Sequence, residues 1–361
     1  MNGTSFAPGH GSDVTRVGQP VLVADHLRKD FPLKQLMGGR RVVQAVEDAS
    51  LVLYAGQAVA LVGESGSGKT TVARMLAGMH TPTKGKIVFR NEEVHLQRGQ
   101  EFKHYIRQVQ YVFQDPFSSL NPAHSVRYHL SRPLRRHGHA GGTVEVEKQS
   151  LALLEKVSLT PASQFLDKYP HQLSGGQRQR VSIARSLAVG PSVVLADEPV
   201  SMLDVSIRLD ILNLLLKLKE EEGLAFLFIT HDIASARYFA EQTQVMYAGQ
   251  MVEGGPSDEV IRQPKHPYTR LLRSAAPDPD RMAQAAEGLN GSGGTPERGE
   301  PPSLIKPPAG CRFHLRCPHA MEVCRQNFPA RTDFGGGHWT HCHLYPPTGQ
   351  SGRATFFQEA K

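Results

Sequence analysis

The stretch Gly63-Glu64-Ser65-Gly66-Ser67-Gly68-Lys69-Thr70-Thr71 decides the fold of this chain. An apolar run at residues 59–62 comes before it, and a helix-compatible segment at residues 71–77 follows. A strand, a glycine-rich loop and a helix in this order predict a phosphate-binding loop.

The chemistry of this stretch suits a bound polyphosphate. Glycines let the backbone curl until successive N–H groups point at one anion, and the helix N-terminus adds its positive end. Lys69 is expected to reach the outer phosphates and the Thr70 hydroxyl to bind Mg²⁺. In a plain Gly/Ser turn, a lysine followed by a hydroxyl would have no packing use. The residues expected to bind the nucleotide in this loop are Gly63, Ser65, Gly66, Ser67, Gly68, Lys69, Thr70 and Thr71.

Length and charge set broad limits on the protein. Its 361 residues are enough for one large or two ordinary domains. Lys and Arg exceed Asp and Glu by 41 to 34, a balance that fits nucleic acid, anionic lipid or no special partner. No apolar run reaches the length needed to span a membrane. Residues 1–20 are rich in Gly, Ser and Pro, lack the apolar segment of a signal peptide, and are expected to be disordered.

The four cysteines are confined to the C-terminal part of the chain, between Cys311 and Cys342. A secreted disulfide framework would not be confined in this way. The cysteine pattern therefore indicates the cytoplasm.

Apolar runs and turn residues predict the order of strands and helices. Strands are expected at residues 21–29, 42–53, 59–62, 85–89, 111–113, 193–196 and 224–229, and a hairpin at 245–253. Helices are expected at residues 178–189, 206–222 and 232–241, and a basic helical insertion at 118–172. Alternation of strand and helix from residue 110 to 253 predicts a mainly parallel α/β sheet with right-handed crossovers.

Two carboxylates and a histidine follow buried-type strands. Asp197 and Glu198 come directly after the strand at 193–196, and His231 follows the next strand along the chain. Ligands of open α/β sheets bind at the carboxyl ends of the strands. Asp197 is expected to hold Mg²⁺ and Glu198 to polarise an attacking water. A solvated turn often contains an Asp-Glu pair, but the position after a phosphate loop favours a functional role.

Three further features bear on ligand or partner binding, and two of them, Phe31 and a basic cluster, each allow two interpretations. Phe31 can stack on a purine or pack as a core aromatic. The Leu-Ser-Gly-Gly-Gln stretch at 173–177 opens a helix and describes a second anion site. The basic cluster is either a solvated face or a contact with a partner or lipid headgroups. Its members are Arg127, Arg132, Arg135 and Arg136.

With these motifs in place, the chain resembles an ABC-type ATPase over roughly residues 21–262. Phe31 stands at the adenine-stacking position, residues 63–71 form the Walker A loop, and Gln114 is the Q-loop glutamine. The signature motif (173–177), Walker B (193–198), the D-loop (201–204) and the switch histidine follow in order. The resemblance implies an α/β P-loop NTPase of ABC type. Its mainly parallel core carries an antiparallel β subdomain, a helical subdomain at about 115–175 and a Cys-containing C-terminal extension.

The resemblance also assigns roles. ATP and Mg²⁺ are the implied cofactors, with Glu198, His231 and Gln114 catalytic. Thr70, Gln114 and Asp197 are the implied Mg²⁺ ligands. In a head-to-tail dimer, the signature residues act on the ATP of the partner subunit, next to the D-loop Asp204. The signature residues are Ser174, Gly175, Gly176 and Gln177.

Other stretches narrow the resemblance to the ATPases of dipeptide, oligopeptide and nickel importers. These are Phe-Gln-Asp-Pro-Phe-Ser-Ser-Leu-Asn-Pro at 113–122, His-Pro-Tyr-Thr-Arg at 266–270 and Pro-Pro-Ala-Gly-Cys at 307–311. Met202 stands where this family more often has Ala, but the D-loop aspartate is kept. The basic loop after Phe31 favours the second ATPase of a heterodimeric pair.

The importer resemblance implies a set of partners. They are a second homologous ATPase, two transmembrane permease subunits and, indirectly, an extracytoplasmic substrate-binding protein, with no nucleic acid. The chain would lie at the cytoplasmic face of the membrane. Coupling would pass through residues 114–122 and the helical insertion, which strengthens the membrane interpretation of the basic cluster.

The C-terminal part is expected to consist of a helix and Pro/Gly-rich linker at 263–310 and a four-Cys tail at 311–361. The tail spacing, Cys-x5-Cys-x6-Cys-x17-Cys, matches neither the close pairs of structural zinc nor ferredoxin spacings. Some members of the importer group hold a [4Fe–4S] cluster on a similar quartet. By that resemblance Cys311, Cys317, Cys324 and Cys342 are candidate ligands.

Reduced thiols and zinc remain the alternatives for the quartet. The spare ligands are His314, His319, His338, His341 and His343. Because no sequence feature ties the tail to the phosphates, a cluster here is expected to be structural or sensory.

The rival function is that of a soluble ABC ATPase acting on DNA or ribosomes, which the positive charge would suit. Such proteins carry a long coiled coil, zinc insertions or a second cassette, and this sequence shows none of them. An exporter with a fused membrane domain is also disfavoured. The cargo stays open among peptides, nickel, opines and oligosaccharides, as does the activity of each ATP site.

Overall fold

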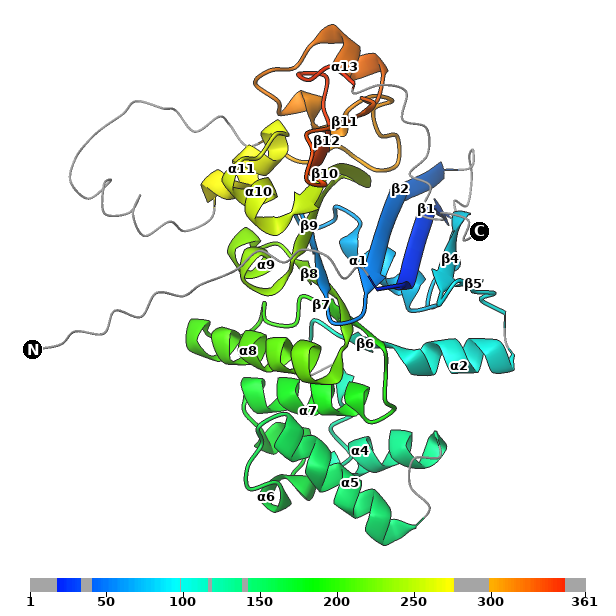
Figure 1. Ribbon diagram of the computed structural model, residues 1–361, viewed down its shortest axis with the longest axis vertical. Coiled ribbons are helices and arrows are strands. Elements are labelled where there is room, and N and C mark those ends of the chain that lie inside the picture. Colours follow the sequence, from blue (N-terminus) through cyan, green and yellow to red (C-terminus); the bar gives the residue numbers. More distant parts are fainter. Residues whose placement is uncertain are drawn as a thin grey trace, which may run out of the picture.

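The computed structural model describes residues 18–33, 41–97, 99–115, 119–137, 142–275 and 299–347. Four of the segments discussed above lie largely outside these ranges. They are residues 1–20, which are expected to be disordered, the basic loop after Phe31, the loop at 138–142 and most of the Pro/Gly-rich linker. Figure 1 shows a central sheet with a helical region at one end and the cysteine-containing tail at the other.

The strands of the described residues form one continuous sheet, whose order is β5-β4-β1-β2-β10-β9-β3-β8-β7-β6. Its parallel core consists of β9 (Gln242–Tyr247), β3 (Ala58–Val62), β8 (Ala225–Thr230), β7 (Val193–Asp197) and β6 (Val109–Val112). Every residue of β3, β7 and β8 is buried, as expected for parallel strands covered on both faces. The predicted parallel α/β core is confirmed.

The antiparallel part of the sheet contains β1 (Pro20–Leu33), β2 (Arg41–Tyr54), β4 (Lys84–Phe89) and the short β5 (Glu92–Glu93). A single parallel bridge between Asp48 and Gln250 joins β2 to β10 (Gln250–Pro256). This part corresponds to the expected antiparallel β subdomain.

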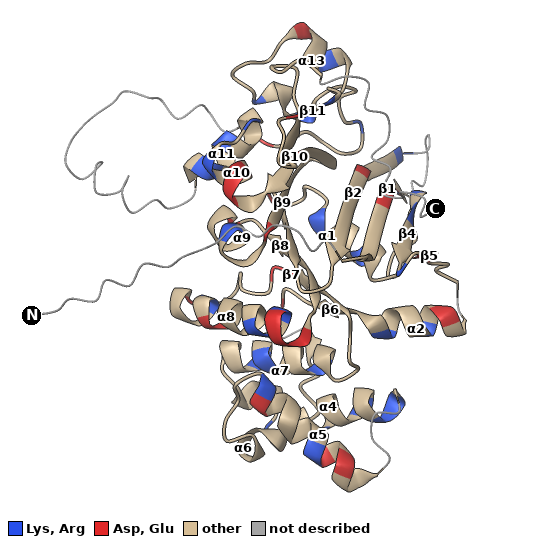
Figure 2. Cartoon of the chain, viewed as in Figure 1, with Lys and Arg blue, Asp and Glu red and all other residues tan. Residues whose placement is uncertain are grey.

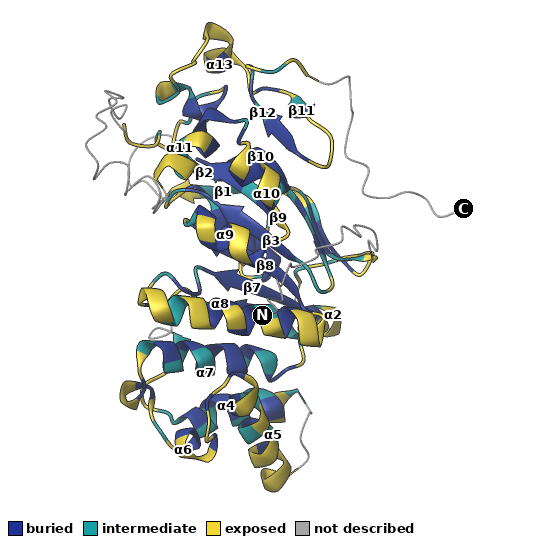
Figure 3. Cartoon of the chain, turned by 60° about the vertical axis from the view of Figure 1, so that its left-hand side comes forward, coloured by how far each residue is buried: buried dark blue, intermediate teal, exposed yellow. Residues whose placement is uncertain are grey.

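Helices cover the sheet and form the predicted insertion. The insertion contains α4 (Val126–Arg136), α5 (Thr143–Lys156), α6 (Ser163–Leu166) and the 3₁₀ turn η1 (Pro170–Gln172), next to α7 (Gly175–Leu187). The remaining helices of the core are α1 (Lys69–Leu76), α8 (Val205–Glu222), α9 (Ile233–Phe239), α10 (Ser257–Arg262) and α11 (Pro267–Ala275). Figure 3 shows buried and exposed residues on opposite faces of α8 and α9.

Three of the described helices escape the sequence analysis: α2 (Gln100–Gln108), α10 and α13 (Glu322–Gln326). The α2 segment does carry apolar residues at helical spacing: Phe102, Tyr105 and Ile106 stand at i, i+3 and i+4 and pack against the core, a pattern that the predicted elements above leave out. Tyr105 packs its ring edge against Phe89, which ties α2 to the antiparallel strands.

The basic cluster of the insertion is partly neutralised. Arg127 pairs with Asp167 at 2.8 Å and with Glu147 at 3.0 Å. Arg135 and Arg136 lie in the last turn of α4, where cations are favoured by the helix dipole. Figure 2 shows charges of both signs over this part of the molecule.

The tail continues the main sheet. It contains the 3₁₀ turn η2 (Arg312–Leu315), α13 (Glu322–Gln326), β11 (Arg331–Asp333) and β12 (Trp339–His341). β12 pairs antiparallel with β10, with Glu253 opposite Thr340 and Gly254 opposite Trp339. A Cβ on Gly254 would lie 2.7 Å from the Trp339 ring, so glycine lets the indole lie flat on the strand. The sequence patterns do not predict this hairpin, because strands of three residues are too short to show an alternation of apolar and polar residues. The predicted segment boundaries stay predictions.

Trp339 is expected to anchor the tail to the sheet, because its buried ring packs on Gly254 and belongs to the same apolar cluster as Val59 and Leu61. Trp339→Ala should lower the free energy of unfolding by about 3–5 kcal/mol, and Trp339→Phe by clearly less. Denaturant unfolding of both variants measures this. A Trp339→Ala protein as stable as the original would contradict the anchoring.

Candidate active site

The loop at residues 63–71, called the phosphate loop below, has a curled backbone that its glycines make possible. A Cβ on Gly63 would lie 2.1 Å from the carbonyl oxygen of Met246, and one on Gly68 would lie 2.5 Å from that of Ala45. Gly68 also has φ of +105°, which disfavours any other residue. β9 and β2 therefore press on the loop from both sides and fix its shape.

Lys69 lies inside this curl and is 4% exposed. Its Nζ donates to the carbonyl oxygens of Gly63 at 2.7 Å and Glu64 at 2.8 Å. Burial lowers the pKa of Lys69, and the carboxylates of Glu198, Asp197 and Glu64 oppose that shift. The ammonium group is therefore held next to the cavity mainly by carbonyl groups, an arrangement that suits an incoming phosphate.

A cavity of about 650 Å³ opens in front of the loop, a size typical of small-ligand sites. The strand ends of the parallel core meet here, as the sequence predicted. Its walls consist of Ala45, Glu64, Ser65, Gly66, Gly68, Lys69, Thr70, Thr71, Gln114, Glu198, His231, Leu272 and Ala275.

Asp197 lies beside the cavity and is almost fully buried. Its Oδ1 accepts from the Thr70 hydroxyl at 3.0 Å, and its Oδ2 accepts from the Tyr111 hydroxyl at 2.6 Å. Burial raises the pKa of Asp197, and the two hydroxyl donors oppose that rise. Tyr111 was not predicted as a site residue, because it resembles any other aromatic residue of a buried strand.

The three predicted catalytic residues lie together: Gln114 and His231 both contact one carboxylate oxygen of Glu198. Oε2 of Glu198 accepts from Gln114 Nε2 at 2.9 Å and lies 3.3 Å from Nδ1 of His231. Glu198 has φ of +45°, a conformation uncommon for residues other than glycine and frequent at functional sites. Its backbone N–H donates to the carbonyl of Ile229, which fixes the turn after β7.

Other predicted site residues lie outside this cavity. Ser174 caps α7: its Oγ accepts from the Gln177 backbone N–H at 3.2 Å, and the Ser174 backbone N–H donates to Oε1 of Gln177 at 3.0 Å. Asp204 precedes the first residue of α8. The Phe31 ring packs edge-on against His80, with 5.3 Å between ring centroids. The roles assigned to these residues stay predictions.

The C-terminal part of the chain reaches the phosphate loop, so the expectation that nothing ties the tail to the phosphates is wrong. The Glu64 backbone N–H donates to the Tyr268 hydroxyl at 2.8 Å, and the Glu64 carboxylate pairs with Arg316 of the tail at 2.8 Å. Leu272 and Ala275 of α11 line the cavity itself. These contacts join residues more than 200 positions apart and leave no local pattern in the sequence.

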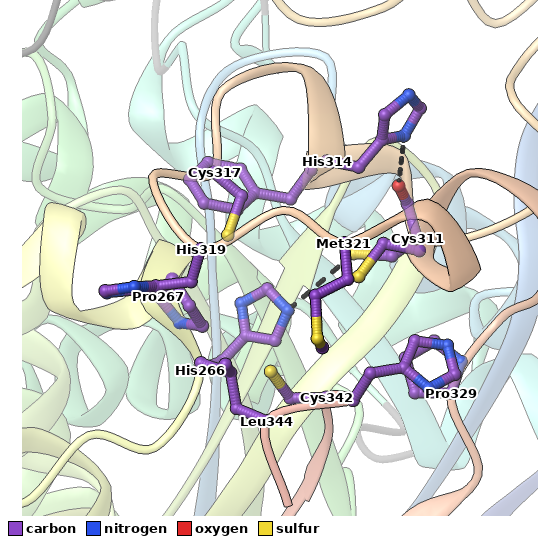
Figure 4. Close-up of a pocket in the computed structure, with 13 residues that line it drawn as sticks. His266, Pro267, Cys311, His314, Cys317, His319, Met321, Pro329, Cys342 and Leu344 are labelled. Atoms are coloured by element: carbon purple, nitrogen blue, oxygen red, sulfur yellow. Dashed lines mark hydrogen bonds between the residues drawn. The ribbon is translucent and has the colours of Figure 1, made fainter.

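The four tail cysteines line one small cavity of about 20 Å³. Figure 4 shows Cys311, Cys317 and Cys342 around His266, whose Nε2 lies 4.0 Å from Sγ of Cys311. The thiols are free, and burial raises the pKa of Cys311 to about 12 and that of Cys342 to about 11.

The histidines that were considered as spare ligands divide into two groups. His314, His319 and His343 line the cysteine cavity. His338 instead pairs with the buried Glu253 at 2.7 Å, and His341 bonds to the Pro329 carbonyl at 2.9 Å. Within the ranges that the structure describes, no three His, Cys, Asp or Glu side chains are arranged to hold a metal ion.

The fold and this site define a P-loop ATPase of the ABC class. Residues 46–201 match the family model described as ABC transporter, and residues 252–324 match the one described as oligopeptide/dipeptide transporter, C-terminal region. The chain belongs to the oligopeptide/dipeptide group of ABC transporter ATP-binding proteins. It is accordingly an ATPase with an energy-coupling role.

Relatives of nearly full length support this assignment. A probable peptide ABC transporter ATP-binding protein of Sinorhizobium fredii is 40% identical over 91% of this chain and 90% of its own length. The dipeptide transport ATP-binding protein DppF of Escherichia coli is 39% identical over 88% of this chain and 92% of its own. Among solved structures, a dimeric post-hydrolysis state of the ATP-binding cassette MJ0796 with ADP and Pi matches with a TM-score of 0.58 and 30% identity. It covers 65% of this chain and 98% of that one.

Tyr111→Phe tests the geometry around Asp197, because it removes one hydroxyl and keeps the ring. Loss of a hydrogen bond that orients a metal-binding carboxylate typically weakens metal binding tenfold or more. We expect the Mg²⁺ concentration for half-maximal ATPase activity to rise roughly tenfold, with little change in stability. The control, Tyr54→Phe on β2, should behave like the original protein. An unchanged Mg²⁺ dependence of Tyr111→Phe would contradict the role of Tyr111.

Proposed function

We propose that this chain is the ATP-hydrolysing subunit of an importer of peptides or related small solutes, bound to the cytoplasmic face of a membrane. The convergence of Gln114 and His231 on Glu198, in the same cavity as Lys69, carries the hydrolytic part of the proposal. The peptide cargo is supported by the C-terminal family match and by the names of the relatives. Among the described residues no helix is long and apolar enough to cross a membrane, so partner subunits would form the pathway.

The residues of the cavity suggest how hydrolysis proceeds. Lys69 and the loop N–H groups bind the phosphates, with the loop glycines giving the backbone access. Thr70, Asp197 and Gln114 offer the oxygen ligands that Mg²⁺ prefers, and Thr70 already contacts Asp197. When bound, Mg²⁺ would neutralise charge that develops on the phosphates. Glu198 accepts a proton from the attacking water, while His231 and Gln114 hold its carboxylate in place.

Several surfaces support a dimeric working state. Ser174 to Gln177 open α7 outside the chain's own cavity, so they are free to face the ATP of a partner subunit, next to Asp204. Apolar side chains at the start of α8 and just before it are exposed: Met202 by 59%, Val205 by 80% and Leu209 by 48%. An exposed apolar patch of this kind is typical of a surface that a partner covers.

The partners we propose are a second homologous ATPase, two transmembrane permease subunits and, indirectly, an extracytoplasmic binding protein. This chain would be the second ATPase of the pair. ATP binding would close the two ATPases on each other, and hydrolysis would let them part. Residues 114–122 and the helical insertion would pass this motion to the permeases. The names of the relatives give no support to the alternative of a DNA- or ribosome-bound ATPase.

Glu198→Gln tests the hydrolytic step, because glutamine keeps the hydrogen bonds but cannot take up a proton. Turnover should fall by roughly 100-fold or more, ATP should still bind, and the ATPase dimer should persist in size-exclusion chromatography with ATP. Glu222→Gln, in an exposed ion pair with Lys156, is the matched control. Near-normal turnover of Glu198→Gln would remove Glu198 from the role of base.

Uptake of labelled di- and oligopeptides tests the cargo. Cells that lack the gene should lose this uptake, the original protein and Glu222→Gln should restore it, and Glu198→Gln should not. Unchanged peptide uptake in the deletion strain would contradict the peptide assignment.

We also propose that Cys311, Cys317, Cys324 and Cys342 hold a [4Fe–4S] cluster. The support is their convergence on one cavity and the absence of disulfides among them. Bound iron would replace the thiol protons, whose loss burial otherwise disfavours at Cys311 and Cys342. The cysteines would have to approach one another from their present positions.

Anaerobic purification of the full chain tests this. Iron and sulfide should be present in equal amounts, with visible absorbance that Cys342→Ser abolishes. Cys342 is chosen because it lies on a loop after β12. Zinc alone, or no metal with four titratable thiols, would contradict the proposal.

A further inference from the structure

Arg316 of the tail forms a bidentate ion pair with Glu64 of the phosphate loop. Arg316 donates from Nη1 to Oε2 of Glu64 at 2.8 Å and from Nη2 to Oε1 at 3.0 Å. Nη1 also bonds to the Tyr247 hydroxyl at 3.2 Å. The Arg316 side chain is only 7% exposed, and that of Glu64 is 30% exposed. A bidentate ion pair of this kind fixes the relative orientation of the two side chains as well as the distance between them.

Glu64 is the second residue of the phosphate loop and lines the nucleotide cavity. Each of its polar groups has a different partner. The backbone N–H donates to Tyr268 of α11, the carbonyl oxygen accepts from Lys69, and the carboxylate binds Arg316. The loop is therefore held by the C-terminal region on one side and by its own phosphate-binding lysine on the other.

The pair has an electrostatic consequence for nucleotide binding. A free carboxylate at the wall of a phosphate cavity would repel a polyphosphate. Arg316 supplies the matching positive charge. Its hydrogen bonds to Glu64 raise the pKa of Arg316, so the charge is present at any working pH. The rings of Tyr247 and Phe313 flank the guanidinium, with centroids 5.7 and 5.8 Å from Cζ.

We propose that Arg316 sets the charge at the nucleotide site of the ATPase: it neutralises the Glu64 carboxylate, which would otherwise repel the phosphates of ATP. The proposal rests on the nucleotide site of the proposed function. It also gives the tail a direct effect on that site, since Arg316 directly precedes Cys317 of the cysteine cavity. A structural change in the cysteine cavity would therefore reach the phosphate loop through Arg316 and its ion pair with Glu64.

Charge variants of the full-length chain test this through nucleotide affinity. With Arg316→Ala we expect the Kd for ATP to rise roughly tenfold and the Kd for ADP to rise less, because fewer phosphate charges meet the exposed carboxylate. The KM for ATP should rise in parallel, with kcat within about twofold. Arg316→Lys should show a smaller effect. Arg325→Ala, which removes an exposed tail arginine paired with Glu322, should match the original protein.

The double variant Glu64→Gln, Arg316→Ala separates charge from structure. It removes the repelling carboxylate and should restore most of the ATP affinity. Glu64→Gln alone should bind ATP at least as tightly as the original protein, which keeps the test valid if Arg316→Ala folds poorly. An affinity unchanged by Arg316→Ala, or a loss that Glu64→Gln does not repair, would overturn the proposal. An original protein that binds no ATP would instead overturn the proposed function.

Discussion

The curl of the phosphate loop depends on two backbone carbonyl groups outside it. The carbonyl oxygen of Met246 on β9 leaves no room for a side chain at Gly63, and that of Ala45 on β2 leaves none at Gly68. Two glycines and two neighbouring strands thus determine where the loop N–H groups point. The parallel core and the antiparallel strands must both be in place before the loop can bind an anion. Nucleotide binding is in this sense a property of the whole sheet.

The cavity was predictable because parallel strands end at a common edge. β3, β7 and β8 are each followed by a residue that lines the cavity at that edge: Lys69 after the loop, Glu198 after β7 and His231 after β8. The antiparallel part and the helical insertion also agree with the sequence patterns. These elements can be predicted from local periodicity and motif spacing, because neither requires knowledge of tertiary contacts.

The contacts that could not be predicted from the sequence join residues far apart along the chain. Tyr111 supports Asp197 from a neighbouring strand, and Tyr268 and Arg316 hold Glu64 from the C-terminal region. No spacing rule links residues so far apart. The β11–β12 hairpin was missed for another reason: strands of three residues have no readable alternation. The two family matches, 46–201 and 252–324, therefore look separate along the chain but meet at Glu64 in the structure.

The central claim is that this ATPase works on a membrane complex. It is tested most directly by affinity purification of the tagged protein from gently solubilised membranes, with the attached chains identified by mass spectrometry. The account predicts two multi-spanning proteins and a second, similar ATPase. Recovery only from the soluble fraction, with ribosomes or nucleic acid attached, would contradict it.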